Sequence, residues 1–340
     1  MKKQIRRWSN WYKNQRKKSQ LETLIGAELM PLIKSCENII SDSIGEHVYT
    51  KFRDLGGVNN LGMLMHYSIE SHRAIAISKI EECLLAEREY RFLTWQKNYR
   101  RGVLSAVPIG IAKTQSYTCF ISSVLEQPEK FSYFQAEHLF EVMGEDSQFL
   151  SYLALDGNKE NLANEIDGST KIKSVLVNIV SQFNTNKADA FYKQFILERN
   201  SLFSSDQELY LKFKNVMHDI YDLLKTRDLK SFEGLVHGDF KPQNILTDND
   251  GYKVIDCQYY TYGIRLWDLA FLYSKDVNGF SRIIDHIDAH DLRDEKLLLV
   301  FFYLIASLMS VKQKRAKKII EMKIIPAVEY ANKIIRCSKL

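Results

Sequence analysis

The stretch LVHGDFKPQNILTDNDGYKVID, residues 235–256, decides how the rest of the chain is interpreted. Its Asp-Asn-Asp-Gly segment at 248–251 is typical of a tight hairpin turn, so we expect a strand on each side of it. With the turn centred near 249–250, Asn244 lies opposite Asp256, and Asp239 lies in the loop that leads into the first strand. Oxygen ligands of this kind suit a hard cation such as Mg²⁺, and Asp239 is placed to orient or deprotonate an attacking hydroxyl.

The residues before this hairpin predict a small β-rich region. We expect strands at 47–55, 62–70, 72–80, 108–114 and 116–125 and a helix at 82–97, because short apolar runs alternate with turn residues there. In the third strand Ile75, Ile77 and Lys79 share one face at period two, so a lysine ends an otherwise apolar face.

After residue 128 the pattern becomes mostly helical to the C-terminus, apart from the hairpin. The longest apolar run, LLLVFFYLIASLM at 297–309, has 13 residues, and a membrane span needs about 20, so we expect a buried core helix. The predicted fold class is α+β, with a small β-rich lobe and a large mainly helical lobe. The predicted domains are a basic helical extension at 1–46, an N-lobe at 47–126 and a C-lobe at 127–340.

Composition excludes several classes of protein. The 340 residues are 45% hydrophobic and 26% charged, which is typical of a globular protein and not of a disordered or fibrous one. The five cysteines include no C-x-x-C pair, which excludes a thiolate zinc site and a disulfide framework. We therefore expect a soluble, cytoplasmic protein.

The charge is concentrated at the two ends. Residues 1–20 contain eight Lys/Arg and no acid, and residues 311–340 contain nine Lys/Arg against two Glu, although the net charge is only +5. The part between them is therefore acidic, which does not fit a nucleic-acid-binding protein, and we do not expect nucleic acid as a partner. For residues 1–20 a packed or solvated helix and a helix on an anionic membrane surface both stay open, and contact of this segment alone with nucleic acid is the third alternative.

The hairpin motif resembles that of a known family. His237-Gly238-Asp239, with Asn244 five residues after the aspartate and Asp256 twelve residues further, is similar to the motif of the aminoglycoside phosphotransferase/choline kinase-like family. That family has the two-lobed protein-kinase-like fold, so the resemblance implies this fold and a kinase that uses ATP and Mg²⁺. The resemblance covers about residues 47–275.

The resemblance also implies roles for single residues. It implies that Asp239 is the catalytic base, that Asn244 and Asp256 bind magnesium, and that Asp268 braces the catalytic loop. Lys241, in the run D-F-K-P, is placed to reach the γ-phosphate.

On the nucleotide side, Lys79 matches the lysine that binds the α- and β-phosphates, and Glu89 matches its ion-pair partner. Glu82 and Glu87 compete for that role, since they lie on the same predicted helix. The other nucleotide-binding residues implied are the hinge residues Val124 and Glu126 and the glycines Gly56 and Gly57.

The differences between this sequence and the motifs of protein kinases indicate the class of substrate. Gly238 replaces the arginine of H-R-D, and the eleven residues between Asp256 and Asp268 leave no room for a long activation loop. We therefore expect phosphate transfer to a hydroxyl of a small molecule, such as a sugar, an amino sugar or an amino alcohol. Two alternatives remain: a kinase that acts on a protein or a membrane glycolipid, and a non-catalytic nucleotide-binding scaffold.

Overall fold

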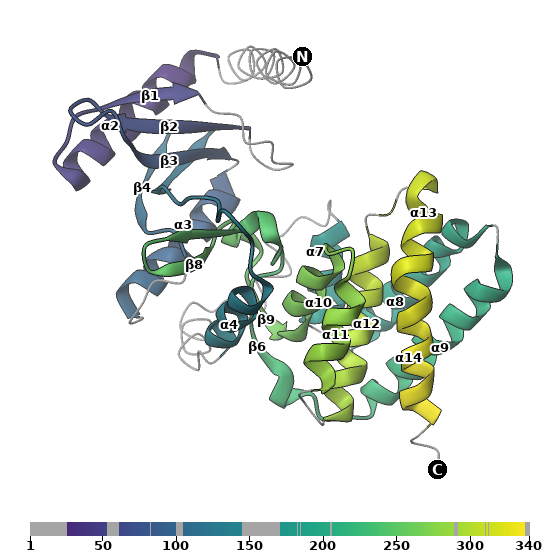
Figure 1. Cartoon of the computed structure of the whole chain (residues 1–340). Coiled ribbons are helices and arrows are strands. Elements are labelled where there is room, and N and C mark those ends of the chain that lie inside the picture. Colours follow the sequence, from purple (N-terminus) through teal and green to yellow (C-terminus); the bar gives the residue numbers. More distant parts are fainter. Residues whose placement is uncertain are drawn as a thin grey trace, which may run out of the picture. The chain divides into compact units, whose positions relative to one another are not determined.

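The structure is a computed structural model, shown in Figure 1. It describes residues 26–52, 61–81, 83–99, 105–144, 171–181, 183, 185–204, 206–288, 292–309, 311 and 313–336. The chain divides into two compact units, which are described one at a time. Unit 1 consists of Met1–Glu129 and Leu246–Gln258, and unit 2 consists of Lys130–Ile245 and Tyr259–Leu340. The basic segment 1–20 and the predicted glycine turn at 56–60 lie outside the described residues.

Unit 1 contains a five-stranded antiparallel sheet with the strand order β1-β2-β3-β5-β4. Its strands are β1 (Val48–Phe52), β2 (Gly62–Ser68), β3 (Ala74–Glu81), β4 (Pro108–Lys113) and β5 (Thr118–Ser123). All five strands predicted from the apolar runs are confirmed. The short connections from β2 to β3 and from β4 to β5 explain the antiparallel pairing of these strands, whereas β3 pairs with β5 although α3 (Cys83–Tyr99) and β4 lie between them in the chain.

Two helices of unit 1 pack on the sheet, and β3 divides its side chains between them. One is α2 (Leu29–Ile44) and the other is α3 (Cys83–Tyr99). Ala76 and Ile80 of β3 lie in the same apolar cluster as Leu32 and Ile40 of α2. The intervening side chain of Lys79 contacts α3 instead, because successive residues of a strand point to opposite faces.

The predicted hairpin is present as β7 (Ile245–Asp248) and β8 (Gly251–Val254). Gly251 has a φ of 118°, which the turn requires and which side chains rarely adopt. The hairpin joins unit 1 by a backbone bridge, since the N–H of Glu126 donates to the carbonyl of Thr247 at 2.9 Å and the reverse bond is 2.8 Å. Asp256, which follows β8, is therefore carried by unit 1.

Unit 2 is mainly helical, with one short two-stranded sheet of β6 (Glu233–Val236) and β9 (Thr261–Ile264). Its α-helices are α4 (Tyr133–Gly144), α7 (Lys171–Val175), α8 (Asn186–Arg199), α9 (Gln207–Lys225), α10 (Leu266–Ser274), α11 (Gly279–Asp288), α12 (Arg293–Met309), α13 (Gln313–Ile319) and α14 (Ile325–Arg336). Its short helical segments are the π-helices η2 (Leu176–Val180) and η7 (Ile320–Ile324) and the 3-10 helices η3 (Asn200–Phe203), η4 (Lys230–Phe232) and η5 (Pro242–Asn244). A further 3-10 helix, η6 (Cys257–Tyr259), follows the hairpin.

Helix α12 forms the centre of unit 2. Every residue from Leu297 to Met309 is buried, so the apolar run is the core helix that its length predicts. No helix in the described part of the chain is long and apolar enough to cross a membrane. The predicted α+β class is confirmed, with a small β-rich unit and a large mainly helical one.

Candidate active site

In unit 1 a buried lysine is surrounded by carboxylates. Lys79 Nζ lies 3.1 Å from Glu89 Oε2 and 2.6 Å from Asp256 Oδ1, and the residue is 7% exposed. The competing Glu87 pairs with Lys113 instead, and Glu82 lies outside the described residues. The structure therefore brings together Lys79, Glu89 and Asp256, which come from β3, α3 and the segment after β8.

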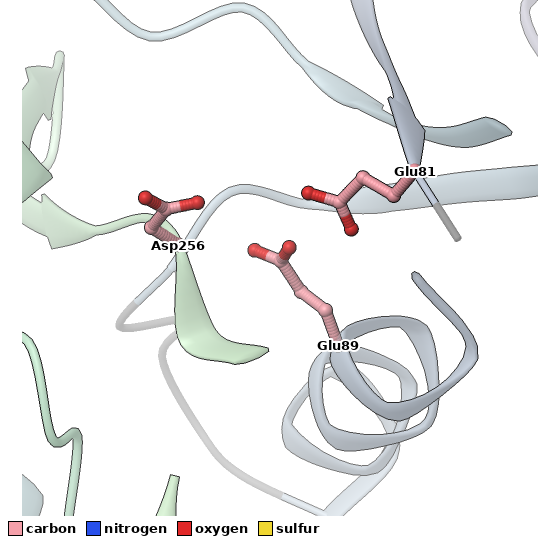
Figure 2. Close-up of side chains that lie close together, drawn as sticks. All are labelled: Glu81, Glu89 and Asp256. Atoms are coloured by element: carbon pink, nitrogen blue, oxygen red, sulfur yellow. The ribbon is translucent and has the colours of Figure 1, made fainter. Parts of the chain in front are cut away.

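A third carboxylate, which the sequence analysis did not single out, completes this cluster. Glu81 is fully buried, and both of its carboxylate oxygens lack a hydrogen-bond partner among the described residues. Figure 2 shows its side chain directed toward those of Glu89 and Asp256, and the three groups can offer ligand oxygens within 4.8 Å of one another. Extending the period of two beyond Lys79 places Glu81 on the same strand face, so the sequence did hold the signal.

The charges of this cluster do not balance. Burial lowers the pKa of Lys79, but Asp256, Glu89 and Glu81 outweigh it and hold that pKa well above its usual range. Burial raises the pKa of Glu81 to about 8, and it also raises the pKa of Glu89. One ammonium group therefore faces three carboxylates, and the excess negative charge favours a proton or a cation.

Glu89 also fixes the backbone that carries Asp256. The N–H of Cys257 donates to Glu89 Oε1 at 3.0 Å, while the same carboxylate binds Lys79. Asp256 has a φ of 65°, which non-glycine residues rarely adopt. Strained backbone of this kind is found where a side chain is held in place for function.

In unit 2, the loop that follows β6 is built around Gly238 and Asp268. The backbone N–H groups of His237 and Gly238 donate to the two oxygens of Asp268 at 2.6 and 2.9 Å, so Asp268 braces the loop as expected. Gly238 has a φ of 88°, and a Cβ there would lie 2.8 Å from the Tyr259 carbonyl oxygen. Glycine is therefore required in this loop, which explains why no arginine can occupy the position.

Asp239 is held by one of its two carboxylate oxygens. Its Oδ2 accepts from Lys241 Nζ at 2.5 Å and from Asn244 Nδ2 at 3.0 Å. Its Oδ1 is buried and has no hydrogen-bond partner among the described residues. Such an arrangement fixes the orientation of the carboxylate and leaves one oxygen for the proton of a hydroxyl.

Each unit offers donor groups of the kind that bind magnesium, the ion that the resemblance implies. Asn244 uses its Nδ2 on Asp239, so its amide oxygen is the atom that remains for a ligand. Asp256 is a carboxylate in a cluster with excess negative charge, and the orphaned oxygens of Glu81 belong to that cluster. These are hard oxygen donors, which Mg²⁺ prefers. Asn244 belongs to unit 2 and Asp256 to unit 1.

The four other predicted nucleotide-binding residues are two glycines and two hinge residues, and the structure describes only the hinge residues. Gly56 and Gly57 lie outside the described residues. Both peptide groups of Glu126 are engaged by Thr247, so its backbone is already used within unit 1. Val124 follows β5, is half-buried and has no such bridge among the described residues.

Comparison with known proteins gives one family match. The sequence profile of the phosphotransferase enzyme family matches residues 171–295, a stretch that contains Asp239, Asn244, Asp256 and Asp268. The resemblance predicted from the motif is confirmed over these residues. No curated protein sequence matches the chain.

Several solved structures are similar at low identity. A thermostable mutant of aminoglycoside phosphotransferase APH(4)-Ia, bound to AMP-PNP and hygromycin B, is 15% identical over 89% of this chain and 98% of its own, with a TM-score of 0.47. A putative fructosamine-3-kinase from Haemophilus somnus 129PT is 15% identical over 91% and 98%, with a TM-score of 0.46. Choline kinase from Cryptosporidium parvum Iowa II is 13% identical over 89% and 93%, with a TM-score of 0.40. At these values the similarity carries no conclusion about activity.

Proposed function

We propose that this chain is an ATP- and Mg²⁺-dependent phosphotransferase that moves the γ-phosphate of ATP to a hydroxyl of a small molecule. The family match over residues 171–295 supports a phosphotransferase. The single observation that carries the proposal is the state of Asp239, whose Oδ2 is held by two neighbours while its buried Oδ1 has none among the described residues.

In the proposed reaction the acceptor hydroxyl donates its hydrogen bond to Asp239 Oδ1. The hydroxyl oxygen attacks the γ-phosphorus, and the bond from that phosphorus to the β–γ bridging oxygen breaks, which releases ADP. The hydroxyl proton passes to Asp239 and then to solvent, so charge and protons balance. The carboxylate contributes mainly by aiming the hydroxyl, because phosphoryl transfer needs positioning more than covalent help.

Unit 1 would bind the nucleotide. Lys79 would neutralise the α- and β-phosphates, and Glu89 would hold it in place, as it does at 3.1 Å here. The peptide groups of Val124 would contact the adenine, since those of Glu126 are engaged by Thr247. Magnesium bound by Asp256 of this unit would neutralise phosphate charge that the lysine alone does not balance. The amide oxygen of Asn244 is the donor that unit 2 would offer to magnesium.

The proposal is tested by phosphate transfer from γ-labelled ATP into a cell extract. Wild type is compared with Asp239→Asn, with and without a chelator, and products are divided into small-molecule, lipid and protein fractions. We expect label in the small-molecule fraction with wild type and magnesium only.

The same assay decides between the alternatives. Label in the protein or lipid fraction would show a kinase of another substrate class. Equal labelling above background by wild type and Asp239→Asn would contradict catalysis by this aspartate, and no label with either protein would favour a nucleotide-binding scaffold. Binding of AMP-PNP by both proteins, measured in parallel, shows that the variant is folded.

A further inference from the structure

Beside the catalytic loop, unit 2 holds lysines that have no carboxylate partner. Lys323, in η7, is 7% exposed, and its Nζ donates to the backbone carbonyl of Ser274 at 2.6 Å. Lys275, the residue after α10, has its Nζ 3.8 Å from the centre of the Phe271 ring. Neither lysine forms an ion pair among the described residues.

These lysines are connected to the loop that carries Asp239 by a short chain of contacts. Phe271 packs on Trp267, with ring centroids 5.3 Å apart, and Trp267 Nε1 donates to the carbonyl of Gly238 at 3.0 Å. Lys275 is close enough to Asp239, Lys241 and Lys323 for their charges to act on it. Burial lowers the pKa of Lys275 to about 8, so its ammonium group lacks sufficient compensation.

The acids nearby are already engaged. Asp276 Oδ2 accepts from Arg282 Nε at 2.6 Å, and Asp276 adds to the charge felt by Lys323. Glu137 Oε1 accepts from the hydroxyl of Tyr273 at 2.7 Å. Asp239 itself is bound by Lys241. Among the described residues, neither Lys275 nor Lys323 therefore has a carboxylate of its own, since Asp239 is shared with Lys241 and Asp276 with Arg282.

A purely structural role, that of capping helix α10, explains only one of the two lysines. Ser274 is the last residue of α10, and a lysine there satisfies a free carbonyl and suits the helix dipole. One lysine is enough for that cap, however, and Lys323 supplies it. Lys275 is a second, half-buried ammonium that is repelled by the first, and an anion would stabilise it because removing charge from water is costly.

We infer that Lys275 and Lys323 form a binding site for an anionic group of the acceptor, so that the substrate is a small hydroxyl compound that already carries a phosphate or a carboxylate. This deepens the proposed function and rests on it, because Asp239 must act on a hydroxyl of the same molecule. It narrows the acceptor class and disfavours the purely cationic amino alcohols and amino sugars that the sequence left open.

The first test identifies the charge of the acceptor without needing its name. A small-molecule extract is divided on an anion-exchange resin before γ-labelled ATP and wild-type protein are added, and a lipid extract is assayed beside it. We expect label only with the resin-retained fraction. Label with the unretained fraction would overturn the inference, and label with the lipid extract would overturn the small-molecule source.

The second test uses variants with the retained fraction as acceptor. We expect Lys275→Met and Lys323→Met each to raise the KM for acceptor about tenfold or more, since a hydrogen bond to a charged group is lost, and to leave the KM for ATP unchanged. Lys275→Arg should restore most of the affinity. Lys317→Met, at a side chain that is 88% exposed, is the matched control. A raised KM for ATP would mean that the lysines bind nucleotide phosphates, and a lower melting temperature with unchanged KM would mean a helix cap only.

A third readout does not depend on turnover. Acylation of Lys275, followed by mass spectrometry, is compared in inorganic phosphate and in chloride at equal ionic strength. We expect phosphate to protect Lys275 severalfold and Lys317 not at all, and equal labelling in both salts would count against the site. If phosphate protects Lys275 but no fraction accepts label, the proposed phosphotransfer is contradicted and the anion site is supported. Failure of the proposed function can therefore be distinguished from failure of this inference.

Discussion

The charged clusters of the two units differ in which sign of charge is in excess. In unit 1, one lysine, Lys79, faces three carboxylates, two of which it binds directly. In unit 2, the carboxylate of Asp239 binds Lys241 and also acts on Lys275, while Asp276 acts on Lys323 and pairs with Arg282. An excess of buried charge is unfavourable until an ion of opposite sign arrives, so each cluster indicates what it binds. The cluster in unit 1 therefore favours a cation, and the proposed site in unit 2 would bind an anion.

The largest predicted effect comes from removing Lys79, which is the only cation of the unit 1 cluster among the described residues. Lys79→Met would leave Glu81, Glu89 and Asp256 buried together, and we expect unfolding to become easier by about 3–5 kcal/mol. Urea unfolding measures this change. Lys113→Met on β4 is the control, since its pair with Glu87 is half-exposed and should cost under about 1 kcal/mol. Equal effects of the two variants would contradict the charge imbalance.

The next prediction concerns how stability depends on pH through Glu81, whose carboxylate has no hydrogen-bond partner among the described residues. Burial raises the pKa of Glu81 to about 8, above its usual 4.5, so the folded state holds a proton that the unfolded state has lost between these values. Because the folded state then binds more protons, stability must fall as pH rises from about 5 to 8, by up to about 4 kcal/mol. Glu81→Gln should flatten this slope, measured by urea midpoints without nucleotide or divalent cations.

Glu70→Gln serves as the control for that series, because Glu70 is exposed on the turn after β2. Its pH profile should follow that of wild type. A Glu81→Gln profile as steep as wild type would show that other groups, such as Glu89, carry the proton.

A third prediction concerns the brace of the catalytic loop. Asp268→Ala would leave the buried N–H groups of His237 and Gly238 without acceptors, and we expect a loss of about 2–4 kcal/mol in stability. Asp222→Ala, at an exposed position on α9, should change stability little. Thermal and urea unfolding of both variants measure the difference, and an equally small effect at both positions would contradict the bracing role.

The smallest predicted effect is at the glycine of the same loop. Gly238→Ala would force a side chain into a φ of 88° and against Leu176 and the Tyr259 carbonyl, at a cost of about 1–3 kcal/mol. Gly251→Ala has a similar positive φ of 118° but nothing within 4 Å of its Cβ, so it separates backbone strain from crowding. Gly238→Ala should be the more destabilising of the two, and the reverse order would contradict the crowding.

Much of the fold could be predicted because its signals are local. The strands of unit 1 follow from alternation and turns, and the core helix α12 follows from its unbroken apolar run. The motif around Asp239 is local too, since Lys241 and Asn244 contact it from two and five residues away. Such features need no knowledge of tertiary packing.

The features that escaped prediction depend on contacts between distant segments. Lys275 and Lys323 meet at the end of α10 although 48 positions separate them in the sequence, and nothing in either neighbourhood marks them. The pairing of Glu126 with Thr247 likewise joins segments far apart in the sequence, and it engages the backbone groups that the predicted hinge contact would use. Glu81 differs, because strand alternation alone places it beside Lys79.

The measurement that tests the central claim most directly compares binding and turnover in one variant of each unit. Affinity for Mg²⁺–AMP-PNP and transfer from γ-labelled ATP are measured for Asp239→Asn and for Lys79→Arg, a variant that keeps the charge of the unit 1 cluster. We predict that Asp239→Asn binds the nucleotide like wild type while transfer falls at least about 10²-fold, and that Lys79→Arg binds the nucleotide more weakly. Normal transfer by Asp239→Asn would contradict the account.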